Sequence, residues 1–150
     1  MRFRYWLLAF FGYMMLKLKH ETEYDPLIKQ ISNEHDNSPH LVKALIKIES
    51  NFNPKAHNLT KKEDSRGLGQ VNVPTAKLHG VTDYSRLYEP ELNIDVMNKI
   101  IDDLKTRYED FTDIIAAYNA GRVITKDGKY INSEYVFKVY SYYLLYNVLG

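Results

Sequence analysis

Apolar residues recur at intervals of three and four along most of the chain, the spacing that puts them on one face of an α-helix. The clearest stripe follows Pro90, a residue type that is common in the first turn of a helix. This stripe predicts a helix over residues 89–108 and consists of Ile94, Met97, Ile101, Leu104 and Tyr108.

Capping and breaking residues predict the remaining helices. Ser38 and Pro39 are typical of the cap and the first residue of a helix, which stops before Pro54 because proline disfavours helical geometry in the residue that precedes it. Gly121 is typical of the position that follows a helix. The predicted helices span residues 26–34, 39 to about 53, 74–80, 89–108, 112–121 and 133–146, the last two capped by Thr112 or Asp113 and by Ser133.

Two polar stretches separate these helices. Residues 55–64 are polar almost throughout and predict a surface loop. Residues 123–131 have Asp127 and Gly128 at their centre, a pair typical of a tight β-hairpin turn. The predicted fold class is therefore mainly α, formally α+β, with a small β-hairpin.

The first twenty residues differ from the rest of the chain. Arg2 and Arg4 precede an apolar run over residues 5–16, two lysines follow, and no acid occurs in the segment. A run of this kind resembles an export signal, and it is shorter than the roughly 20 residues that a membrane-spanning helix needs. No small-residue cleavage site follows, so a cleaved signal, an uncleaved membrane anchor and a helix packed on the domain or a partner all remain open. We divide the chain into this segment, residues 1–20, and one domain, residues 21–150.

Composition narrows the classes of function. The 150 residues suit a single domain, and a net charge of +1 argues against a protein that coats nucleic acid. The lack of cysteine excludes a disulfide scaffold, a thiol nucleophile and a cysteine-ligated metal. The five histidines show no metal-binding spacing, so we expect no metal and no cofactor.

Glu49 is the candidate catalytic residue because it lies on the apolar face of its predicted helix. At about 100° per residue, Val42 and Leu45 lie roughly 20° and 40° from it around the helix. Burial raises the pKa of a carboxyl, and a Glu raised toward neutrality can deliver a proton near pH 7. The alternative is a Glu at the edge of the stripe that reaches water. Ser50 either donates a hydrogen bond to this acid or satisfies the backbone at the helix end.

Two further motifs add polar groups suited to a sugar. Gly67-Leu68-Gly69-Gln70 allows the backbone to approach a ligand closely and adds an amide that both donates and accepts. Residues 116–121, AAYNAG, place one phenol and one amide among small residues at a helix end. Each motif alone is also typical of an ordinary turn or of helix packing.

Together these motifs resemble the lytic transglycosylase domain of the soluble transglycosylase type, which has a lysozyme-like fold. The resemblance covers about residues 38–140. It rests on the series ESNFNP from Glu49, GLGQ from Gly67, AYNAG from Ala117 and YV from Tyr135. The order of the series is specific, whereas each separate motif is not.

The resemblance implies that Glu49 is the single acid and base of a peptidoglycan lytic transglycosylase. This residue would protonate the glycosidic oxygen between N-acetylmuramic acid and N-acetylglucosamine, while the N-acetyl group stabilises the developing positive carbon. It would then take the proton of the muramic 6-hydroxyl, which closes a 1,6-anhydro ring. The other implied site residues are Ser50 on the acid, Gly69, Gln70, Tyr118 and Asn119 in the sugar cleft, and Tyr135 near the acid.

The resemblance also implies partners and a location. Peptidoglycan strands would be the substrate, in the cell envelope or periplasm, with membrane contact through residues 1–20. A secretion or conjugation machine, a flagellum or a phage particle would suit such a protein. Two alternatives remain open, a goose-type lysozyme-like hydrolase and a non-catalytic peptidoglycan-binding assembly component. Hydrolysis would need a second acid, which Glu63 or Asp64 would supply if either faced the cleft.

The chain departs from the family pattern in three places. Gly69 stands where the family usually has Met, which would remove an apolar wall from one sugar subsite. Arg122 and Val123 follow AYNAG in place of Pro-Gly, and a hairpin-like insert comes next. Residues 55–66 form a loop a few residues longer than usual.

Overall fold

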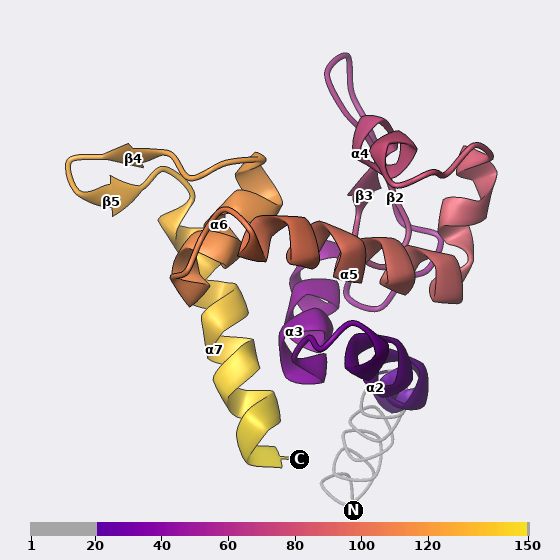
Figure 1. Cartoon of the computed structure of the whole chain (residues 1–150), viewed down its shortest axis with the longest axis horizontal. Coiled ribbons are helices and arrows are strands. Elements are labelled where there is room, and N and C mark those ends of the chain that lie inside the picture. The colour runs from indigo at the N-terminus through magenta and orange to yellow at the C-terminus, as the bar shows by residue number, and fades with distance from the viewer. Residues whose placement is uncertain (1–20, 150) are drawn as a thin grey trace, which may run out of the picture.

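Helix α3 (Pro39–Ser50) lies at the centre of the computed structural model, which describes residues 21–149 (Figure 1). It contacts helices from both ends of the chain, and Val42, Ala44 and Ile46 on its surface are fully buried. The helices packed on α3 are α2 (Asp25–Glu34), α5 (Pro90–Lys105) and α7 (Ser133–Leu149).

The ends of α3 place Glu49 and explain the turn that follows it. The Ser38 side chain accepts a hydrogen bond from the backbone N–H of Leu41, which confirms the predicted cap. The helix ends at Ser50, three residues before the predicted end. Asn51 and Phe52 then adopt left-handed backbone conformations with φ of 50° and 62°, and the Phe52 side chain is buried in the core. Glu49 therefore lies in the last turn of a helix whose end is fixed by core packing.

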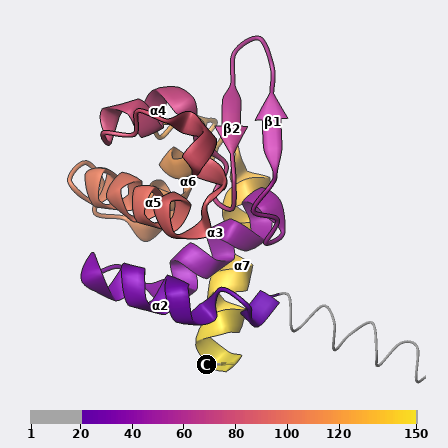
Figure 2. The ribbon, with the colours of Figure 1, turned by 90° about the vertical axis from the view of Figure 1, so that its right-hand side faces the viewer.

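Residues 55–64 lie at the surface as predicted, but they are not a loop throughout, because a small antiparallel sheet includes part of them. In the sheet, β2 lies between β1 and β3, and Ser65 of β2 pairs with Asn58 on one side and Asn72 on the other. All residues of β1 are exposed, so this strand has no apolar alternation that could reveal it. The β1–β2 hairpin projects from the helices (Figure 2). The strands are β1 (His57–Leu59), β2 (Asp64–Arg66) and β3 (Val71–Asn72).

The later helices follow the predicted order with shifted ends. Helix α5 ends at Lys105, before the predicted residue 108, and α6 is capped by Asp110 instead of Thr112 or Asp113. The Asp110 side chain accepts hydrogen bonds from the two backbone N–H groups of those residues. Gly121, with φ of 75°, ends α6 as predicted. Helix α4 spans Val73–Leu78, and α6 spans Phe111–Ala120. The short 3₁₀ helix η1 (Tyr84–Tyr88), between α4 and α5, was not predicted from the sequence.

The predicted hairpin is present between α6 and α7. Strands β4 (Thr125–Lys126) and β5 (Lys129–Tyr130) are joined by Asp127 and Gly128, whose φ angles of 52° and 73° suit a turn with two left-handed residues. Helix α7 begins at Ser133 itself, so this residue is not the cap that the sequence predicted.

The predicted fold class, mainly α with small β elements, is confirmed. Within residues 21–149, none of the helices has the length and apolarity needed to cross a bilayer. The predicted signal or anchor over residues 1–20 lies outside the described residues.

Candidate active site

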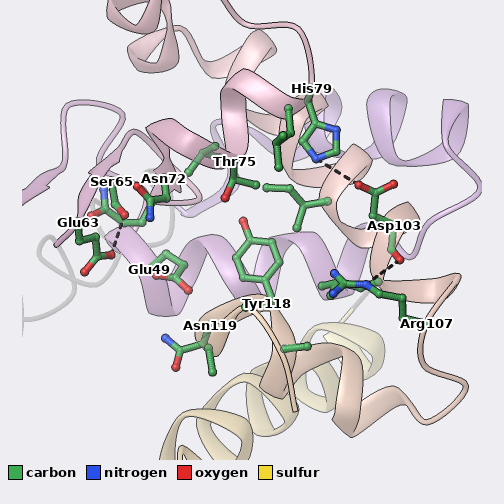
Figure 3. Close-up of a pocket in the computed structure, with 18 of the residues that line it drawn as sticks. Glu49, Glu63, Ser65, Asn72, Thr75, His79, Asp103, Arg107, Tyr118 and Asn119 are labelled. Atoms are coloured by element: carbon green, nitrogen blue, oxygen red, sulfur yellow. Dashed lines mark hydrogen bonds and ion pairs between the residues drawn. The ribbon is translucent and has the colours of Figure 1, made fainter. Parts of the chain in front are cut away.

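A groove of about 620 Å³ runs from the small sheet along α4, α5 and α6 (Figure 3). Glu49, in the last turn of α3, is part of the wall of this groove. Residues of the sheet and of α6 also line the groove. The sequence-predicted residues that line it are Glu49, Gln70, Tyr118 and Asn119. The other three, Tyr135, Gly69 and Ser50, are not among the residues that line it.

Glu49 is held by a phenol from the far end of the chain. The Tyr135 hydroxyl, in the first turn of α7, donates a hydrogen bond to Oε1 of Glu49 at 2.5 Å. Burial raises the pKa of Glu49 to about 7, the hydrogen bond from Tyr135 opposes this rise, and the charge of Glu63 adds to it. A carboxyl with this pKa exists in both forms near neutral pH and can act as acid and then as base.

Two tyrosines beside Glu49 stay protonated. Burial raises the pKa of Tyr118 and Tyr135 well above 10, and the negative charge of Glu49 adds to both rises. Each phenol therefore remains a hydrogen-bond donor throughout the physiological pH range. The Tyr118 hydroxyl donates to the backbone carbonyl of Gly69 at 3.1 Å. This bond fixes the ring of Tyr118 in the groove wall.

Gly69 accepts the hydrogen bond that holds Tyr118 in the groove wall, and no empty space remains where a side chain at this position would lie. A Cβ atom at this position would lie 2.2 Å from Sδ of Met97 and 2.4 Å from its Cγ. Met97, a fully buried residue of α5, therefore fills the space beside the glycine. This contact lies in the core, because Met97 is fully buried and does not line the groove.

The side chain of Asn93, in α5, joins three backbone segments near Gly69 by hydrogen bonds. No role was predicted for this residue from the sequence. Its Oδ1 accepts from the N–H of Gly69 at 2.8 Å, and its Nδ2 donates to the carbonyls of Arg66 and Leu87 at 2.9 and 2.7 Å. Only 1% of its surface is exposed. Its position near the apolar stripe of α5 is the same signal that singled out Glu49 on α3.

Gln70 lies in the groove, whereas Ser50 does not donate a hydrogen bond to Glu49 as one of its two predicted roles required. Gln70 lines the groove in a left-handed conformation with φ of 46°, and its Nε2 donates to the carbonyl of Gly67 at 3.1 Å. Its Oε1 and the second N–H of its Nε2 are then available to a ligand. The Ser50 hydroxyl instead donates to the carbonyl of Ile46 at 3.3 Å, so it satisfies the helix backbone and does not hold Glu49 in this structure.

The two acids before Gly67 point to opposite sides of β2. Glu63 lines the groove, where the hydroxyl of the buried Ser65 donates to its Oε1 at 2.7 Å and the Asn58 amide donates to its Oε2 at 3.2 Å. Asp64 binds Arg66 and His57 instead, and the hydrogen bond from Arg66 contributes most to lowering its pKa to about 2. The groove therefore contains a second, positioned carboxylate. Within residues 21–149, no three acids or histidines come together as metal ligands would.

The chain belongs to the transglycosylase SLT domain family, which it matches over residues 26–140. The family predicted from the motif series, and with it the lysozyme-like fold, is therefore confirmed.

Two similar proteins illustrate the relationship. The chain is 34% identical over 132 residues to membrane-bound lytic murein transglycosylase C of Photorhabdus laumondii subsp. laumondii, a match that covers 74% of this chain. It covers 36% of that relative, so the chain spans about a third of the relative's length. The X-ray structure of an inactive mutant of lytic transglycosylase Slt from Pseudomonas aeruginosa superposes with a TM-score of 0.63 at 17% identity. This second match covers 83% of this chain and 24% of the Slt chain, and at that identity it shows the fold alone.

Proposed function

We propose that this protein is a peptidoglycan lytic transglycosylase that cleaves the β-1,4 bond between N-acetylmuramic acid and N-acetylglucosamine. The observation that carries the proposal is the carboxyl of Glu49, which faces the groove with a pKa of about 7 and is held by Tyr135. Membership of the family and the name of the relative from Photorhabdus laumondii support the same reaction class.

In the first step, protonated Glu49 gives its proton to the glycosidic oxygen as the bond from that oxygen to the muramic C1 breaks. The carbonyl oxygen of the substrate's own N-acetyl group stabilises the positive charge that develops on C1, the recognised alternative to a second enzyme carboxylate. Glu49 is left as a carboxylate. The hydrogen bond from Tyr135 favours this charged form, because a donor stabilises a carboxylate more than a neutral acid.

In the second step, the Glu49 carboxylate takes the proton of the muramic 6-hydroxyl. The 6-oxygen forms a bond to C1, the anhydro ring closes, and Glu49 returns to its protonated form. One residue thus serves as acid and base without net consumption of water. Tyr118 and Tyr135 keep their protons in both steps, because burial holds their pKa values well above 10.

The substrate strand would lie along the groove, with the amides of Gln70 and Asn119 on the sugars. Both line the groove and both types of side chain bind hydroxyl and acetamido groups well. An envelope location agrees with the word membrane-bound in the name of the Photorhabdus laumondii relative. We extend the proposal to residues 1–20 as the export signal or anchor that brings residues 21–150 to the wall, alone or within an envelope machine.

The test is cleavage of purified sacculi by the wild-type chain and by Glu49→Gln, followed by mass spectrometry of the products. Gln keeps the shape of the side chain and cannot give a proton. We expect wild-type lysis, products about 18 Da lighter than hydrolytic ones, and activity lowered by at least about 100-fold in the variant. Equal lysis by both proteins would refute the role of Glu49. Binding without lysis by either would favour a non-catalytic wall-binding component.

Glu63 favours a second candidate function, hydrolysis as in goose-type lysozyme-like enzymes. A carboxylate held by Ser65 and Asn58 in the same groove could take a proton from water as that water attacks C1. The product would then carry a reducing end and the additional mass of water. The same mass measurement separates the two reactions.

A further inference from the structure

The segment between α6 and α7 folds back along α6 and is hydrogen-bonded to both of its ends. At the first turn, the Tyr130 hydroxyl donates to Oδ1 of Asp113 at 2.7 Å and lies 2.9 Å from Oγ1 of Thr112. At the last turns, Nδ2 of Asn132 donates to the carbonyl of Ala116 and to Oδ1 of Asn119, both at 3.0 Å. The segment between α6 and α7 therefore supplies a side chain to a groove residue.

These two hydrogen bonds of Asn132 determine the orientation of the Asn119 amide, that is, which side its oxygen and its nitrogen occupy. The carbonyl of Ala116 can only accept, so the Asn132 atom that faces it must be the NH₂ group. The same NH₂ group faces the Asn119 amide, so the atom presented by Asn119 must be its oxygen. The NH₂ group of Asn119 is then directed away from Asn132, and Figure 3 shows it on the side of the amide that faces Glu49.

We propose that Asn132 is a positioning residue that turns the NH₂ group of Asn119 into the groove, so that this subsite selects a hydrogen-bond acceptor on the sugar strand. The inference rests on the proposed glycan substrate and deepens it. Peptidoglycan sugars carry such acceptors in the carbonyl oxygens of their acetamido groups and in the muramic ether oxygen. A free Asn side chain would present either end of its amide, whereas the bond to Asn132 selects one.

The experiment measures the affinity of the full chain for purified peptidoglycan glycan strands. Glu49→Gln is present in every protein, so that cleavage does not interfere. Asn119→Asp still accepts the hydrogen bond from Asn132 and loses the N–H groups that face the groove. Asn132→Ala leaves the Asn119 amide free to turn. We expect each change to weaken binding by roughly 3- to 10-fold, the range for one hydrogen bond.

A double-mutant cycle separates orientation from stability. Once Asn119→Ala has removed the amide, adding Asn132→Ala should weaken binding no further. Tyr130→Phe removes the other attachment of the same hairpin and should leave affinity unchanged. Asn147→Ala is the matched control, because Nδ2 of Asn147 also donates to a helix carbonyl, that of Tyr143, at 2.7 Å in α7.

Each outcome bears on the inference. Unchanged affinity in Asn132→Ala or Asn119→Asp would overturn the inference and leave the proposed function standing. An equal loss in Tyr130→Phe would overturn it too, because Asn132 would then serve only to hold the hairpin. Failure of the Glu49→Gln protein itself to bind glycan would overturn the inference and the proposed substrate together. If Asn132→Ala does not fold, the Asn119→Asp result decides, since that change keeps the bond to Asn132.

Discussion

The Tyr135 hydroxyl and the Glu49 carboxylate are joined by a 2.5 Å hydrogen bond between the first turn of α7 and the last turn of α3. The bond links the C-terminal helix directly to the candidate acid. Helix α3 also packs along α7, so the distance between these two side chains is set by the core and not by a loop. The two proposed catalytic steps place opposite demands on this bond, because it favours the charged form of Glu49 and disfavours the form that gives the proton.

Removing that bond should change the pH dependence of the reaction. In Tyr135→Phe, Glu49 loses the hydrogen bond that lowers its pKa, and burial continues to raise it. The pKa of Glu49 should therefore rise, and the alkaline limb of the kcat/KM profile on sacculi should move to higher pH. We expect the maximal rate to fall roughly 10-fold, because the bond no longer stabilises the carboxylate that forms when Glu49 gives up its proton. A profile that stays at the wild-type position would show that Tyr135 only packs there.

Glu49 should also lower the free energy of unfolding at alkaline pH. Its pKa in the folded chain, about 7, lies above the ordinary value of 4.5, so the folded state binds the proton more tightly than the unfolded state. The resulting stability is complete below pH 4.5 and is lost as the pH rises through about 7. Glu49→Gln removes this dependence. We expect the variant to be more stable than the wild type by on the order of 1–3 kcal/mol at pH 8, with a smaller difference at pH 5, in thermal or urea unfolding.

The sequence predicted the position of Glu49 because helix geometry is local. A spacing of 100° per residue places this acid beside Val42 and Leu45 whatever the rest of the chain does. The hairpin at Asp127 and Gly128 was equally predictable, because few residue pairs accept two left-handed conformations in succession.

The sheet and its side-chain directions could not be predicted in the same way. Successive residues of a strand point to opposite faces, so a shift of one residue in register would exchange Glu63 and Asp64 between groove and far side. Register here depends on the pairing of Ser65 with Asn72, which no apolar pattern encodes. For the same reason the sequence did not predict the contact of Met97 with Gly69 or that of Asn132 with Asn119, since each joins residues that are distant in sequence or separated by a turn.

The close contact between Gly69 and Met97 predicts coupling between the two positions. In Gly69→Ala, a Cβ would lie within 2.4 Å of two Met97 atoms, which forces a shift costing roughly 1–3 kcal/mol. Met97→Ala alone should cost about 2–5 kcal/mol by leaving a cavity in the core. The double variant should lose less than the sum of the two, because the new methyl occupies part of that cavity. Denaturant unfolding of the four proteins measures this, and simple additivity would contradict it.

Asn93→Ala should destabilise the groove wall more than an ordinary polar deletion. The change leaves the N–H of Gly69 and the carbonyls of Arg66 and Leu87 without the side chain that satisfies them. Buried polar groups left without partners cost about 1–3 kcal/mol each when water cannot reach them, so we expect a loss of at least about 2 kcal/mol. Asn147→Ala, on the exposed side of α7, provides the comparison and should change the free energy of unfolding by less than about 0.5 kcal/mol.

Glu63→Gln distinguishes an electrostatic role for Glu63 from a catalytic one. The negative charge of Glu63 raises the pKa of Glu49, so removing it should lower that pKa and move the alkaline limb of the pH profile to lower pH. If the anhydro ring is formed by the substrate's own 6-hydroxyl, product masses should stay the same and the rate at pH 6 should change by less than about threefold. Asp64→Asn is the control for a neighbouring acid, because Asp64 faces Arg66 and His57 on the other side of the strand. A hydrolytic product in the wild type that disappears in Glu63→Gln would instead identify Glu63 as the base that activates water.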